Sequence, residues 1–231
     1  MSTVLRKRLL RRGPTEPPGF DPATIPGQPT DRTLTIDGDE FHCRTVTSPD
    51  GEWTLAFGQR ADRATSRAFR IRNDRVVDWR SVSRPTHGAI ANDGTVALVS
   101  GTGPSDVGGS LEVFDGEEIH LERQFNATTG LPAIRADGSF VAVSTRPPAS
   151  TVTLFDVGAN RAVAAQTVPR RTPRVLGFHG DGEYLYVGIR RNDDPYLALD
   201  TTGTVLWGSD RFRASRPLRA RLESLTEQLR S

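Results

Sequence analysis

The sequence predicts an all-β fold, and three observations support this prediction. Four Asp-Gly pairs follow one another at intervals of 43, 44 and 44 residues. A mostly apolar run follows each of these pairs. A second apolar stretch, which ends near an aspartate, recurs after the first run at a similar interval. A repeat of roughly 40–45 residues is the period of a four-stranded propeller blade. We therefore expect a small β-propeller of four to five four-stranded blades with a short C-terminal α-helix. The repeated pairs are Asp50-Gly51, Asp93-Gly94, Asp137-Gly138 and Asp181-Gly182.

Residues 1–30 combine a basic tip with a proline-rich segment. Residues 13–30 contain six prolines, which predicts an extended linker without a core of its own. The basic tip either contacts nucleic acid, an anionic membrane or an acidic protein, or forms a solvated tail. Its charged residues are Arg6, Lys7, Arg8, Arg11 and Arg12.

The composition is that of a soluble protein. No apolar run approaches the ~18 residues that a membrane span needs, and the first residues lack the apolar stretch of a secretory signal. Cys43 is the single cysteine, so an intramolecular disulfide is excluded and a reducing compartment is favoured. We expect a cytoplasmic protein for which binding at a membrane surface is not favoured.

Residues 31–213 are expected to form the propeller. Residues 32–41 are expected to form a strand followed by an Asp37-Gly38 turn. This extra strand either closes the ring or covers a sheet edge. In each repeat the Asp-Gly pair suits a tight hairpin because glycine accepts positive φ. The apolar run after it suits a strand covered on both faces by neighbouring blades. We favour a closed ring over a half-ring that dimerises or a small open array.

The Asp-Gly turn, the apolar second strand and the third strand ending in an apolar residue and aspartate resemble the blades of WD-repeat and quinoprotein-like β-propellers. This third-strand pattern ends at Asp115, Asp156 and Asp200, and the resemblance covers roughly residues 41–213. The Gly-His and Trp-Asp dipeptides of true WD repeats are missing. The resemblance therefore implies the propeller fold, and we infer no quinone or other cofactor from it.

Residues 214–231 are expected to form an amphipathic helix. Ser215 and Pro217 are suitable start residues, and four leucines at 4-3-4 spacing form one apolar stripe. Because so short a helix is marginal alone in water, the stripe must pack on the propeller, on a second copy or on a partner. The stripe consists of Leu218, Leu222, Leu225 and Leu229.

No catalytic or metal-binding motif stands out. His42 and Cys43 are adjacent, so on a strand they point to opposite faces and do not ligate one ion. The other histidines, His87, His120 and His179, are isolated in sequence and receive no catalytic role. The Gly-rich stretch 101–110 lacks the spacing of a phosphate-binding loop and is expected to be a loop between strands. We predict a protein that is not an enzyme and needs no cofactor or metal.

The connections of a propeller emerge alternately on two sides, and the charges sort accordingly. The side with the blade-to-blade links, called here the link side, is expected to be positive, and the side with the Asp-Gly turns, the turn side, negative. An Arg-lined side attracts an anionic partner even at a net charge of +2. The arginines expected to bind a partner are Arg60, Arg84, Arg146, Arg170, Arg171, Arg174, Arg190 and Arg191.

These features favour a non-enzymatic scaffold that mediates protein–protein interaction through the link side and the C-terminal leucines. The alternative is a nucleic-acid-associated protein whose basic tip and link side hold phosphates. The sequence does not distinguish the oligomeric states.

Overall fold

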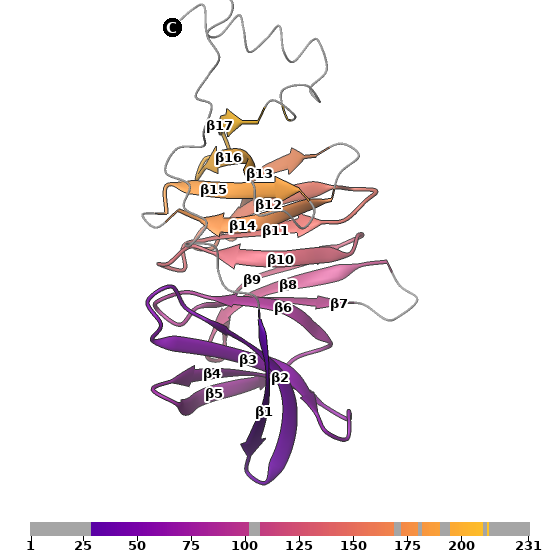
Figure 1. The fold of residues 1–231 in the computed structure, drawn as a ribbon, viewed down its shortest axis with the longest axis vertical. Helices are drawn as coiled ribbons and strands as arrows, with labels where there is room; N and C mark the ends of the chain where they lie inside the picture. Colours follow the sequence, from indigo (N-terminus) through magenta and orange to yellow (C-terminus); the bar gives the residue numbers. More distant parts are fainter. Residues whose placement is uncertain are drawn as a thin grey trace, which may run out of the picture.

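A computed structural model describes residues 29–101, 107–168, 172–179, 182–189, 195–209 and 212. These residues form seventeen β-strands arranged in four antiparallel sheets, as drawn in Figure 1. The all-β prediction is confirmed. No helix within the described ranges is long and apolar enough to cross a membrane.

Each sheet consists of strands that follow one another in the chain and pair in that order. The first sheet contains β1 (Thr30–Ile36), β2 (Asp39–Thr47), β3 (Trp53–Arg60), β4 (Ser66–Arg72) and β5 (Arg75–Ser81). The second contains β6 (Pro85–Ile90), β7 (Val96–Gly101), β8 (Gly109–Asp115) and β9 (Glu118–Phe125). The third contains β10 (Thr129–Ile134), β11 (Phe140–Thr145), β12 (Thr151–Asp156) and β13 (Arg161–Thr167). The fourth contains β14 (Pro173–Phe178), β15 (Tyr184–Ile189), β16 (Pro195–Asp200) and β17 (Val205–Gly208).

The Asp-Gly pairs at 50–51, 93–94 and 137–138 lie in the turns between the first two strands of their repeat units, and Gly182 directly precedes Glu183 and β15. Gly51, Gly94 and Gly138 have φ values of 78°, 89° and 74°, a region that glycine enters without steric cost. The preceding aspartates cap their own turns: for example, the Asp93 carboxylate accepts a hydrogen bond from the backbone N–H of Thr95 at 2.8 Å. The repeat therefore marks the turns as predicted.

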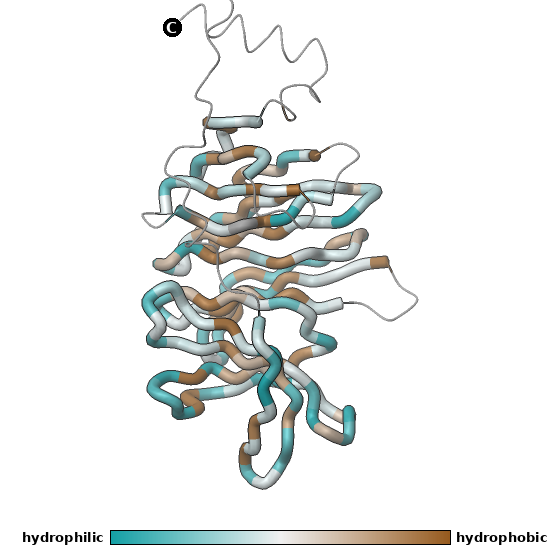
Figure 2. Tube along the Cα trace, in the orientation of Figure 1, coloured by the Kyte–Doolittle hydropathy of each residue, from teal (hydrophilic) through white to brown (hydrophobic). Residues whose placement is uncertain are grey.

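Consecutive sheets pack face to face through apolar clusters. Leu55 and Phe57 of β3 meet Leu98 of β7 and Phe114 of β8 between the first and second sheets. Two further clusters join the second sheet to the third and the third to the fourth. Figure 2 shows apolar residues distributed along the strands throughout this stack. The fold is thus held together by burial between neighbouring sheets.

The expectation of a closed ring is wrong for the described residues. The first and fourth sheets lie at opposite ends of the stack in Figure 1, and the extensive contacts between sheets join consecutive sheets. The open arrangement is explained by β1, which pairs antiparallel with β2 and forms the edge of the first sheet. Leu34 and Ile36 of β1 pack against a cluster that includes Phe41, Phe69 and Ile71, on the face of the first sheet that points away from the second. The β1–β2 hairpin therefore occupies the face that a closing blade would need.

The C-terminal helix predicted over residues 214–231 lies outside the described residues. The same holds for the basic tip and the proline-rich segment up to residue 28. The structure thus describes an open arc of four blades, the first of which carries a fifth strand.

Candidate anion-binding interface

The first three sheets each contribute a basic residue to a group around β6: Arg44 from β2, His87 from β6 and Arg146 from the position after β11. Arg44 of β2 extends from the face of the first sheet that points toward the second. Its Nη1 donates a hydrogen bond to the backbone carbonyl of Thr86 at 2.6 Å and lies 3.5 Å from Nδ1 of His87, both on β6. Arg146 follows β11 directly and is exposed. We refer to Arg44, His87 and Arg146 as the inner basic cluster.

His87 is kept neutral by its surroundings. Burial, then the charges of Arg44 and Arg146, lower the pKa of His87 from 6.5 to about 4. At neutral pH its ring therefore accepts hydrogen bonds at one nitrogen and donates at the other. His87 is thus an uncharged polar ring whose pKa is affected by two guanidinium groups.

Neither arginine of the cluster forms an ion pair with an acid of the described residues. No carboxylate in the described ranges lies within 4.0 Å of either Arg44 or Arg146, whereas other arginines form such pairs. Asp31 is the cross-strand neighbour of Arg44 in the β1–β2 register and is the nearest acid in the pairing pattern. Nη1 of Arg44 already donates to Thr86, and guanidinium donors that are not paired with a carboxylate favour a carboxylate or phosphate ligand, because their planar arrangement matches such groups.

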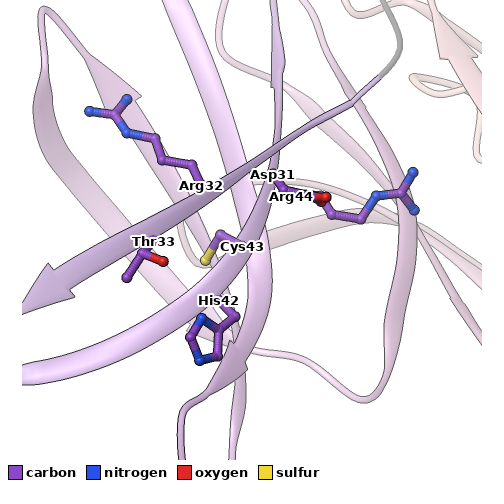
Figure 3. Close-up of a pocket in the computed structure, with 6 residues that line it drawn as sticks. All are labelled: Asp31, Arg32, Thr33, His42, Cys43 and Arg44. Carbon is purple, nitrogen blue, oxygen red and sulfur yellow. The ribbon is translucent and has the colours of Figure 1, made fainter.

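A shallow pocket of about 250 Å³ lies beside the cluster on the β1–β2 hairpin. Figure 3 shows Arg32 and Arg44 extending to opposite sides of the hairpin, so this pocket does not direct both charges at one ligand. Cys43 is buried, and burial raises the pKa of its thiol to about 11, which leaves it protonated and unreactive. The residues that line the pocket are Asp31, Arg32, Thr33, His42, Cys43 and Arg44.

The structure describes four of the eight arginines predicted to bind a partner. Arg60 is paired: its guanidinium contacts Asp62 and lies 3.3 Å from Asp39. Arg84 occupies the link between the first two sheets with a φ of 47°. Arg146 belongs to the inner basic cluster, and Arg174 lies in β14. The others, Arg170, Arg171, Arg190 and Arg191, lie outside the described residues, as do Leu218, Leu222, Leu225 and Leu229.

The turn side was expected to be negative, but arginines of neighbouring segments pair with some of its carboxylates. Arg72 of β4 lies 2.6 Å from the carboxylate of Glu52, and Arg135 lies 3.6 Å from that of Asp137. Arg72 is the last residue of β4, and Arg135 directly follows β10, where its carbonyl accepts a hydrogen bond from the Gly138 N–H. The sequence-based count of turn residues included neither.

Sequence reasoning missed Arg44 and His87, although the repeat contains a signal for them. Each lies six positions before the aspartate of its Asp-Gly turn, Asp50 or Asp93. Equivalent positions of the repeat occupy equivalent places on successive inner strands, so the two side chains are expected to come close. Within the described ranges, no group of three or more His, Cys, Asp or Glu side chains is arranged to hold a metal.

The lowered pKa of His87 predicts a pH-dependent stability. The pKa in the folded state lies below that of the unfolded chain, so the unfolded state binds the proton first as the pH falls. We expect neutral His87 to make its full contribution to the free energy of unfolding above about pH 6.5, and this contribution to be lost as the pH falls from about 6.5 to 4. The loss should reach about 2 kcal/mol, allowing for the partial exposure of the ring. The measurement is the difference in urea-unfolding free energy between wild type and His87→Gln at pH 7 and pH 4. Parallel pH dependences of the two proteins would contradict it.

The sequence matches no protein-family model and no curated protein. Among solved structures, the chain is similar to a putative 6-phosphogluconolactonase from Bacteroides uniformis, with 14% identity and a TM-score of 0.44, over 78% of this chain and 66% of that chain. It is also similar to the β-propeller domain of Cps50 (Swd1) from Myceliophteria thermophila, with 12% identity and a TM-score of 0.47, over 84% of this chain and 54% of that chain. The chain thus spans about two thirds and about half the length of these two structures.

Proposed function

We propose that this protein is a non-enzymatic scaffold that binds an acidic segment of a protein partner at the inner basic cluster on the link side. The observation that supports the proposal is that Arg44 contacts His87 and that Arg146 is near enough to lower the pKa of the same ring, while neither arginine forms an ion pair within 4.0 Å with a carboxylate of the described residues. Side chains of Asp or Glu on a partner would supply the missing charge. Each new charge-assisted hydrogen bond contributes about 1.5–3 kcal/mol.

A protein ligand is favoured over nucleic acid by the distribution of aromatic side chains. Sequence-tolerant binding of single strands uses exposed aromatic rings on which bases stack. Among the described tryptophan, tyrosine and phenylalanine residues, Trp79 is the most exposed, at 46%, and it lies on the outer strand β5. The guanidinium of Arg67 already covers its ring, 3.9 Å from the ring centroid. Within the described ranges, the cluster therefore offers charge without an adjoining exposed tryptophan, tyrosine or phenylalanine ring.

The test compares two double variants that remove the same charge from opposite sides of the arc. Arg44→Gln/Arg146→Gln removes the cluster, and Arg75→Gln/Arg161→Gln removes two exposed arginines from the turn side. Binding of a fluorescein-labelled twelve-residue Glu-rich peptide is measured by fluorescence anisotropy at low salt. We expect the first variant to weaken binding at least about tenfold, which corresponds to about 1.4 kcal/mol, and the second to change it little.

Equal weakening by both double variants would show that binding depends on overall charge alone and would contradict the proposal. The same titration with a twelve-nucleotide oligothymidine tests the alternative. If the oligonucleotide binds more tightly than the peptide, and the cluster variant weakens it with a steep salt dependence, the nucleic-acid alternative replaces the proposal.

A further inference from the structure

The first sheet has a large aromatic side chain at a position where the other sheets have a polar or small residue. In each later sheet, one apolar residue after the Asp-Gly turn lies on the face that packs against the preceding sheet: Leu98, Val143 or Val187. The strand register connects these residues to the outer strands at Glu122, Ala165 and Gly208. In the first sheet the same connection runs from Ala56 through Phe69 to Trp79 of β5. Trp79 therefore lies on a face that has no preceding sheet.

The face of the first sheet that points away from the second is called here the outer face. Trp79 is 46% exposed on it, and Val76, which pairs with Ile71 of the same face, is 40% exposed. Three of the six exposed large apolar side chains of the described residues lie on β5, namely these two and Val77. Single exposed apolar side chains are common on protein surfaces, whereas a concentration of them marks an interaction site. The concentration on β5 therefore indicates such a site.

Arg67 of β4 is held beside Trp79 without an acidic partner among the described residues. Its guanidinium carbon lies 3.9 Å from the centroid of the Trp79 ring and 5.1 Å from that of the Phe41 ring. Its Nε is buried and has no hydrogen-bond partner. No carboxylate of the described residues lies within 4.0 Å of its guanidinium, although other arginines form such pairs. The two rings thus hold in place a positive charge that the described part of the chain does not pair.

A second arginine, Arg32 of β1, lies on the same face. Arg32 pairs with Cys43, and this register continues through Gly58 to Arg67. Figure 3 shows Arg32 on the side of the hairpin opposite to Arg44, which belongs to the inner basic cluster. The acid that the first sheet's strands place on the outer face is Asp39, and it is already paired with Arg60. The outer face therefore combines exposed apolar side chains with an excess of positive charge.

The register of β5 indicates how a partner would bind. Val76 and Asp78 pair with Ile71 and Arg70, which are consecutive in β4, so Val77 is an extra residue that forms a bulge. A bulge interrupts the free edge along which an added strand would pair. A partner is therefore expected to contact the side chains of the outer face rather than to extend the sheet.

We propose that the outer face binds a protein segment that carries both apolar and acidic side chains, with Trp79 and Arg67 at the centre of the contact. Apolar side chains of the segment pack on Trp79 and Val76, and its carboxylates pair with Arg67 and Arg32. Tryptophan and arginine are the residues that most often dominate the affinity of protein interfaces. The outer face is separate from the inner basic cluster, so this proposal goes beyond the proposed function and can fail independently of it.

The experiment uses the full chain with the inner basic cluster removed, so that only other surfaces can select a ligand. Random twelve-residue peptides displayed on phage are selected on Arg44→Gln/Arg146→Gln, and the most enriched peptides are labelled with fluorescein for anisotropy titrations. We expect peptides that contain apolar residues together with Asp or Glu. Adding Trp79→Ala or Arg67→Gln to this variant should weaken binding at least about tenfold, as expected for a central interface residue.

The matched control is Ile119→Ala in the same variant. Ile119 lies on the outer strand β9 and is 44% exposed, and its truncation should change binding by less than about twofold. Circular dichroism checks that each variant is folded. If Trp79→Ala unfolds the chain, Val76→Ser replaces it, and a loss of at least about threefold is expected.

Three results would overturn the proposal. The first is that no peptide is enriched, or that the enriched peptides lack acidic residues. The second is that Ile119→Ala weakens binding as much as Trp79→Ala does. The third comes from sedimentation velocity of the wild-type chain: a dimer that Trp79→Ala converts to a monomer would assign the outer face to a second copy.

Discussion

Phe57→Ala is expected to destabilise the protein by about 3–4 kcal/mol, the usual range for removing a fully buried aromatic side chain. Phe57 is 1% exposed and lies between the first and second sheets. Its ring packs directly on the second sheet, since a Cβ added to Gly88 of β6 would lie 3.1 Å from the ring. The cavity would therefore open where the two sheets join. Urea unfolding followed by far-UV circular dichroism measures the change.

Val77→Ala is the matched control for this substitution. Val77 lies on the outer strand β5 and is 52% exposed, so its truncation should cost less than about 0.5 kcal/mol. If Phe57→Ala cost no more than Val77→Ala, the packing of the first sheet on the second would not be the source of stability argued above.

The repeat unit was predictable because its signals are local. An aspartate that caps its own turn and a glycine with positive φ act within four residues, so the Asp-Gly pairs mark the turns without knowledge of the tertiary structure. The apolar runs after them became the strands buried on both faces, such as β7. The order of strands within each sheet follows from these two features.

The open arc was not predictable by the same reasoning. Whether the last blade meets the first depends on what covers the outward face of the first sheet. That cover includes Leu34 and Ile36 of β1. The sequence predicts a strand over residues 32–41, but it does not show on which face of the first sheet the side chains of that strand pack. Closure is a contact between distant parts of the chain, and the repeat contains no information about it.

The candidate site was only partly predictable, for a related reason. Sorting charged residues by turn found Arg146 but also Arg60, whose charge is balanced by Asp39 and Asp62. It overlooked Arg44 and His87, because they lie within strands rather than turns. Alignment of strand positions across the repeats would have identified both residues, whereas the pairing of Arg60 depends on side-chain geometry.

Arg70→Met is expected to destabilise the protein by about 2–3 kcal/mol, and Arg72→Met by less than about 1 kcal/mol. The two arginines lie on β4, each 2.6 Å from a carboxylate and each over the ring of Trp53. They differ in burial: the side chain of Arg70 is 11% exposed and that of Arg72 is 47% exposed. Arg70 also donates a hydrogen bond to the carbonyl of Gly94, in the turn between β6 and β7, at 3.0 Å.

The difference between the two variants measures how much of this stabilisation depends on burial. Methionine keeps the aliphatic packing of arginine and removes the charge, so Arg70→Met leaves Asp78 without its guanidinium partner and breaks the hydrogen bond to Gly94. Equal costs for Arg70→Met and Arg72→Met in urea unfolding would contradict the prediction. Because Arg70 and Phe57 both join the first sheet to the second, the double variant should lose less stability than the sum of the single variants. Strictly additive losses would mean that the hydrogen bond and the apolar cluster hold this junction independently.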